Sequence, residues 1–139
     1  MFEAYTVTPA TYETNASVAF TDIRYEDCRV LTSGASTIRV NAPGRYYVEF
    51  HAVASSDTAA SPFTIALYRD DVAFPAVVST ITSTAAGDEQ TMSLSTIINV
   101  LPSNCYINNE TRLRLVVTSE APGTITNSNI VISPLNYGD

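Results

Sequence analysis

Residues 44–52 read Gly-Arg-Tyr-Tyr-Val-Glu-Phe-His-Ala, and their alternation predicts a β-strand. Tyr46, Val48 and Phe50 occupy every second position, so they share one face of an extended chain. The Asn-Ala-Pro-Gly run at 41–44 predicts a turn just before the strand, because Asn, Pro and Gly readily adopt turn conformations. We therefore expect a strand with one face buried in a core.

The same period of two recurs along the rest of the chain. It is found around residues 63–67, 73–84, 92–100, 113–117 and 129–132. The Arg-Asp-Asp-Val run at 69–72 predicts a tight hairpin, and Pro75 in the return strand predicts a bulge or a sheet edge. No segment has the apolar spacing of a helix of useful length. Roughly eight or nine short strands at regular spacing indicate an all-β sandwich or barrel.

The composition supports this fold class and limits the partners. The 139 residues suit one domain, with 45% hydrophobic residues and only 15% charged residues. A net charge of −7 argues against nucleic-acid binding and against docking on an anionic membrane, since both need a basic surface. We find no secretory signal and no apolar run long enough to span a bilayer. We therefore expect a chain made in the cytoplasm.

Several predicted strands are apolar on both faces. A two-sheet sandwich needs only one apolar face per sheet, so the extra residues are either scattered surface positions or a subunit interface. The low charge favours the interface. The predicted interface residues are the apolar Tyr47, Val53, Ile97 and Val116, together with the polar Glu49 and His51, which share a face with Tyr47.

Little in the sequence predicts catalysis. His51 is the single histidine, and it forms a Glu-x-His alternation with Glu49 that is too small for a closed metal site. A Ser or Cys nucleophile would need this one histidine within hydrogen-bond reach. Cys28 and Cys105 have no catalytic signature, and two separate thiols are favoured over a disulfide in a cytoplasmic product. We expect no enzymatic activity and no cofactor.

Adjacent acids in two predicted turns could in principle bind calcium. These are the Asp-Asp dipeptide at 70–71 and the Asp-Glu dipeptide at 88–89. They offer hard oxygen ligands but lack the spacing of a calcium-binding loop. Solvated turn acids are therefore favoured over calcium ligands.

The stretch 44–52 has the pattern G-x-Y-Y-Φ-x-F-H-Φ, where Φ is apolar, and it resembles a central strand of a known jelly-roll superfamily. This superfamily contains tumour necrosis factor and the globular heads of complement component one, subcomponent q. The order of the later segments, at 65–73, 93–98, 113–117 and 129–132, is similar, so the resemblance covers roughly 17–135. The family's Gly-Asp before the penultimate strand is replaced by Asn-Asn-Glu at 108–110, and the closing F-x-G motif is absent.

The resemblance implies a two-sheet antiparallel jelly-roll sandwich of about eight to ten strands that assembles as a trimer. We expect a jelly-roll domain at 17–139, and an N-terminal segment at 1–16 that acts as an attachment or inter-subunit arm. Residues 72–100 resemble small prophage and bacterial members. They imply a structural protein of the virion, a capsid-decoration or head-fibre module of a phage particle. The alternatives are a receptor-binding tip for a host glycan or protein, and a spore-surface protein, which would be expected to carry a Gly-x-y stalk that this chain lacks.

Overall fold

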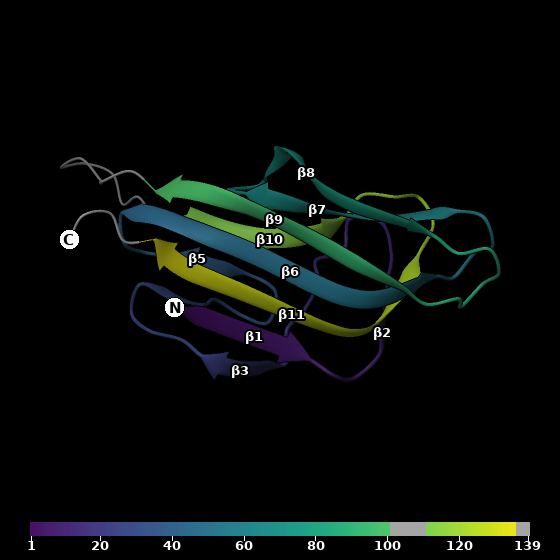
Figure 1. The fold of residues 1–139 in the computed structure, drawn as a ribbon, viewed down its shortest axis with the longest axis horizontal. Helices are drawn as coiled ribbons and strands as arrows, with labels where there is room; N and C mark the ends of the chain where they lie inside the picture. The colour runs from purple at the N-terminus through teal and green to yellow at the C-terminus, as the bar shows by residue number, and fades with distance from the viewer. Residues whose placement is uncertain (101–110, 136–139) are drawn as a thin grey trace.

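The computed structural model describes residues 1–100 and 111–135, which form two packed antiparallel β-sheets (Figure 1). Eleven strands lie within these residues. They are β1 (Phe2–Thr6), β2 (Ala10–Tyr12), β3 (Asp22–Tyr25), β4 (Val30–Thr32), β5 (Ile38–Val40), β6 (Gly44–Ser56), β7 (Pro62–Arg69), β8 (Val72–Thr82), β9 (Gln90–Val100), β10 (Thr111–Val117) and β11 (Gly123–Leu135).

The chain crosses between the two sheets several times, so that each sheet combines strands from distant parts of the sequence. One sheet has the order β3-β1-β11-β6-β9, with β2 pairing with the start of β11. The other has the order β4-β5-β10-β7-β8. The predicted all-β jelly-roll sandwich is therefore confirmed. The described part of the chain contains no helix that is long and apolar enough to cross a membrane.

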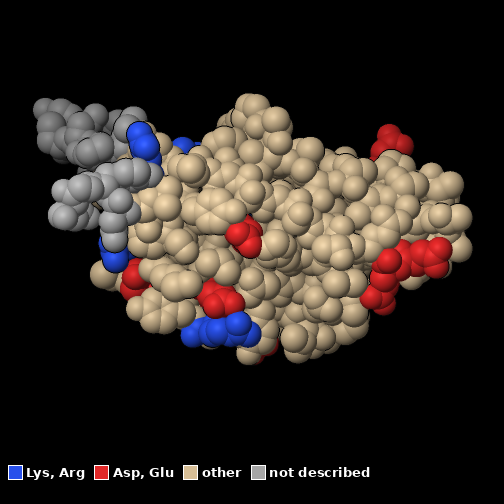
Figure 2. Space-filling model, in the orientation of Figure 1, with Lys and Arg blue, Asp and Glu red and all other residues tan. Residues whose placement is uncertain are grey.

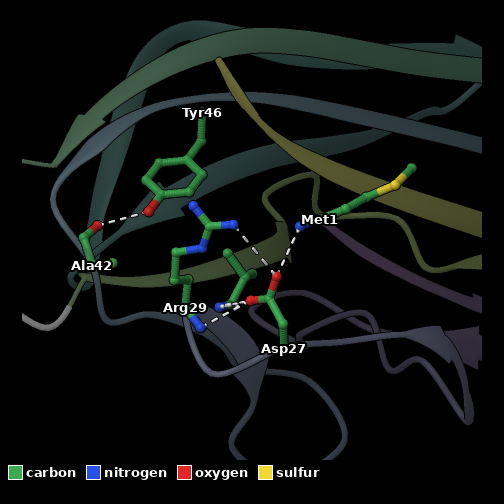
Figure 3. Close-up of polar contacts among 6 residues, drawn as sticks. Met1, Asp27, Arg29, Ala42 and Tyr46 are labelled. Carbon is green, nitrogen blue, oxygen red and sulfur yellow. Dashed lines mark hydrogen bonds and ion pairs between the residues drawn. The ribbon is translucent and has the colours of Figure 1, made fainter. Parts of the chain in front are cut away.

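The core lies between the sheets and contains the predicted face of β6. Tyr46, Val48 and Phe50 are essentially fully buried, and the ring of Phe50 meets that of Phe20 edge to face. The hydroxyl of Tyr46 donates a hydrogen bond of 2.8 Å to the carbonyl oxygen of Ala42, so the polar atom of this buried ring has a partner (Figure 3). The turn at 41–44 thus positions the strand that follows it.

The structure places β1 and β2 of the expected N-terminal segment, residues 1–16, within the sandwich, while the role of this segment as an attachment or inter-subunit arm stays a prediction. β1 forms a five-residue antiparallel ladder with β11 and also pairs with β3, and Phe2 and Ala4 are fully buried in the core. β2 pairs with the start of β11. The N-terminal residues belong to the sandwich because backbone pairing with a strand over 100 residues away fixes them, which local sequence does not reveal.

The hairpin at residues 69–72 is confirmed, and so is the bulge after it. Asp70 and Asp71 both have positive φ, of 51° and 67°, as a two-residue primed turn requires. The β7–β8 register shifts between Ala66 and Tyr68, and the extra residues of β8 include Pro75. β8 also ends its sheet, so proline costs no ladder hydrogen bond on the free side.

Candidate functional site

The candidate site is the outward face of the six-stranded sheet, formed by side chains of β1, β11, β6 and β9 that point away from the core. Its members alternate with buried residues along each strand. The outward residues of these strands include Glu3, Tyr5, Tyr47, Glu49, His51, Val53, Ser93, Ser95, Ile97, Asn129 and Val131. Figure 2 shows the molecule from the side of this sheet, and uncharged residues predominate over β9, β6, β11 and β1.

The apolar part of this face is centred on neighbouring strands β6 and β9. Tyr47 lies directly opposite Ile97 in the antiparallel register. Ile97 is 54% exposed, whereas Tyr47 and Val53 are half-buried. Side chains at directly opposed positions of antiparallel strands are close neighbours, so Tyr47 and Ile97 lie side by side on this face.

The polar part of the face contains the Glu49–His51 pair of β6. The Nε2 atom of His51 hydrogen-bonds to the Oε1 atom of Glu49, so the imidazole carries its proton on Nε2 when the carboxylate is ionised. This hydrogen bond lowers the pKa of Glu49, and a second one from the side chain of Tyr47 lowers it further. Glu49 is therefore held as a carboxylate by the groups around it.

A second charged group lies at the β1–β3 side of the face. Arg24 of β3 pairs with Glu3 at 2.7 Å, and its guanidinium lies 4.7 Å from the ring centre of Tyr5. The amide of Asn129 donates a hydrogen bond of 2.9 Å to Glu3. These positions were not predicted from the sequence. They adjoin only because β1 pairs with β11 and β3, although the polar Asn129 before the apolar 130–132 run is a weak local signal.

Five of the six predicted interface residues lie on this one face, and Val116 does not. Val116 belongs to β10 of the other sheet, is only 4% exposed, and forms an isolated β-bridge with Ser17. Grouping it with Tyr47 is therefore wrong. The alternation places Val116 and Leu115 on opposite faces of their strand, but it does not predict which sheet the strand joins. That the other five residues form an interface stays a prediction.

Three of the four turn acids form hydrogen bonds or an ion pair within the fold. Asp70 accepts a hydrogen bond of 2.9 Å from the backbone N–H of Arg112, and Asp71 pairs with Arg114 at 2.7 Å. Asp88 accepts one of 3.1 Å from the backbone N–H of Ala85. Within residues 1–100 and 111–135, no three His, Cys, Asp or Glu side chains gather as metal ligands would.

Of the two cysteines, one lies within the described residues. Cys28 is an exposed free thiol. Cys105 lies outside the described residues, so the expectation of two separate thiols stays a prediction.

Three loops meet at the end of the sandwich opposite the turn at 41–44 (Figure 1). They are residues 57–61, 83–89 and 118–122, between β6 and β7, β8 and β9, and β10 and β11. Backbone hydrogen bonds join them to one another and to the end of β6, from Asp57 to Pro122 at 3.0 Å and from Gly87 to Ser56 at 3.1 Å. These loops contain four acids and no basic residue. The acids are Asp57, Asp88, Glu89 and Glu120.

Comparison with known proteins identifies the fold. No protein-family model matches the sequence, and no curated protein matches it significantly. Among solved structures, the chain is similar to the Eiger TNF from S. frugiperda, with a TM-score of 0.73 and 12% identity over 99% of this chain and 95% of that one. It is also similar to murine APRIL, with a TM-score of 0.57 and 6% identity over 89% and 97%. At these identities the similarity establishes a TNF-like jelly-roll fold, as the sequence resemblance predicted.

Proposed function

Because the fold is that of the TNF-like jelly rolls, we propose that this chain is a non-enzymatic module that forms a homotrimer through the outward face of its six-stranded sheet. The observation that carries the proposal is the exposed Ile97 beside Tyr47 on a face with few charges. A single exposed isoleucine is ordinary, but a continuous apolar surface is typical of a protein interface. The module needs no cofactor in this role.

Three-fold association fits the distribution of polarity on this face. Subunit interfaces have an apolar core enriched in aromatic residues and a more polar rim. Tyr47 and Ile97 supply the apolar part, while the Arg24–Glu3 ion pair, on β3 and β1, lies two to three strands away from β6 and would form the rim. A closed ring of three copies buries such a face on every subunit without leaving an open end.

The test compares two substitutions at side chains of equal exposure on opposite sheets. Ile97→Glu introduces a charge on the proposed interface, and Val78→Glu introduces the same charge on β8, where Val78 is 51% exposed against 54% for Ile97. Sedimentation equilibrium should find three 15.0-kDa chains per particle for the wild type and for Val78→Glu, and one chain for Ile97→Glu. A trimeric Ile97→Glu, or a monomeric wild type, would contradict the proposal.

We further propose that the trimer is a structural component of a phage virion, where it decorates the capsid or forms part of a head fibre. The resemblance of residues 72–100 to small prophage members supports this role, as does a low-charge chain with no predicted catalytic constellation. Cosedimentation of the purified trimer with capsids that lack this protein tests it. Saturable binding would support decoration, and no binding at micromolar concentration would contradict it.

One observation favours a second candidate, a ligand-binding head that recognises a host glycan or protein. The joined loops at 57–61, 83–89 and 118–122 present four acids without a basic residue, which suits a cationic protein surface better than an anionic one. Binding to host cells, lost when Glu89 and Glu120 are both changed to Gln, would support this role. Retention of binding in that variant would exclude these loops as the contact.

A further inference from the structure

The Glu49–His51 pair lies in β6 between β11 and β9, within the surface that the proposed trimer buries. His51 is the only histidine of the chain, and imidazole is the side chain whose charge ordinarily changes between pH 5 and 8. We propose that trimer assembly takes up protons at His51, so that mild acidification strengthens the trimer. This inference rests on the proposed function and adds a control mechanism to the same face.

Among the described neighbours of His51, the ionisable side chain that contacts it is the carboxylate of Glu49. On β9 it lies opposite Ser93, and on β11 opposite Asn129, neither of which is ionisable. On its own strand, Glu49 is the partner, Tyr47 hydrogen-bonds to that carboxylate, and Arg45 lies on the same face six residues before His51.

The charges farther out on the face are already balanced or remote. Arg24 of β3 lines the same hollow as His51, but its charge is paired with Glu3 of β1, and its guanidinium also covers the ring of Tyr5. Asp22, at the start of β3, accepts a hydrogen bond from the hydroxyl of Thr21. Tyr25 is the other ionisable side chain of β3. The balance of charge at the centre of the face therefore depends on His51.

Burial in the trimer makes the net charge of the Glu49–His51 pair important for the free energy of association. In the isolated chain His51 is 51% and Glu49 35% exposed, so water screens both groups. When three copies associate, each copy with a neutral imidazole brings an uncompensated carboxylate into the interface, and burying an unpaired charge is costly. A protonated imidazole gives a neutral ion pair instead. The trimer should therefore bind protons more tightly than three monomers do.

Linkage sets the size of the effect. If each subunit takes up one proton, the association constant for three chains rises by up to about a thousandfold for each pH unit of acidification.

The experiment measures trimer association by sedimentation equilibrium between pH 5.5 and 8.0 for the wild type and two variants. His51→Gln keeps an N–H donor for Glu49 but does not titrate, and it should abolish the pH dependence. Glu49→Gln leaves an imidazolium without a counter-charge, and it should reverse the dependence, so that acid weakens the trimer. If dissociation is too weak to measure, the urea midpoint for dissociation replaces the association constant.

The possible results test the proton uptake and the proposed trimer separately. A wild-type trimer with the same association constant at every pH would overturn the proton uptake alone, and so would a His51→Gln variant that keeps the wild-type dependence. A wild-type chain that is monomeric at every pH would overturn the proposed function, and this inference with it. Stronger association in acid, lost in His51→Gln and reversed in Glu49→Gln, is the expected result.

Discussion

Replacing Gly123 by alanine tests the packing that joins the two sheets. Gly123 opens β11 in the six-stranded sheet, and a Cβ atom there would lie 2.4 Å from Cγ and Cδ1 of Phe63 and 2.6 Å from Cε1. Phe63 belongs to β7 of the other sheet and is fully buried. Ordinary carbon contacts need about 3.5–4.0 Å, so the ring or the strand must move by more than about 1 Å.

The expected cost is that of overpacking a rigid core. Such substitutions typically cost about 1–3 kcal/mol, and a clash with a fully buried ring should lie in the upper half of that range. For a domain of this size, about 2–3 kcal/mol lowers Tm by roughly 6–10 °C. Thermal unfolding followed by circular dichroism measures this directly.

A double-mutant cycle separates the clash from other effects. Phe63→Ala removes Cγ, Cδ1 and Cε1, the three atoms that the new Cβ meets, so Gly123→Ala should cost less in that background, with a coupling energy of about 1 kcal/mol or more. Gly87→Ala is the contrasting variant, because no atom lies within 4 Å of its new Cβ and only its positive φ of 87° is unfavourable. Wild-type stability of Gly123→Ala, or an equal cost in both backgrounds, would refute the packing described for this site.

Three further predictions concern other parts of the sandwich. Tyr46→Phe removes the hydrogen bond to Ala42 and should cost about 1 kcal/mol in urea unfolding, whereas an unchanged midpoint would mean that the bond contributes nothing. Ala76→Gly should stabilise by roughly 0.5–1 kcal/mol, because Ala76 has a φ of 65° that glycine adopts without strain; a lower Tm would contradict this. Burial acts to raise the pKa of Asp27. Hydrogen bonds from the backbone N–H groups of Arg29 and Val30 and from the terminal ammonium of Met1 outweigh burial and hold this pKa below its usual value (Figure 3). Asp27→Asn should therefore destabilise by roughly 1 kcal/mol at pH 6, and the difference should shrink as pH falls below the ordinary aspartate pKa of 3.8 and through the lowered pKa of the folded protein; a difference independent of pH would refute the assignment.

The sequence predicted the strands whose buried face consists of large apolar residues. Tyr46, Val48 and Phe50 alternate strictly, so only one register buries all of them. β1 follows the same alternation, but its buried positions are Phe2, Ala4 and Thr6, and two of these three side chains are small. Their burial depends on pairing with β11, and no local pattern encodes that partner.

The candidate face was predicted in part for the same reason. Tyr47, Glu49 and His51 lie on one strand, so alternation alone places them together. Ile97 joins them through the β6–β9 register, whereas Val116 enters the other sheet. Alternation distinguishes the two faces of a strand, but the order of strands in the sheets decides which faces meet.

Hydroxyl-radical footprinting at two protein concentrations is the most direct test of the proposed interface. It reports the solvent access of individual side chains, and Ile97 and Val72 provide a matched comparison because both are exposed in the single chain, at 54% and 68%. At a concentration that favours the trimer, the oxidation rates of Ile97 and Tyr47 should fall several-fold relative to the dilute chain, while that of Val72 should change little. Equal oxidation of Ile97 at both concentrations, in a sample shown to be trimeric, would place the interface elsewhere and contradict the account.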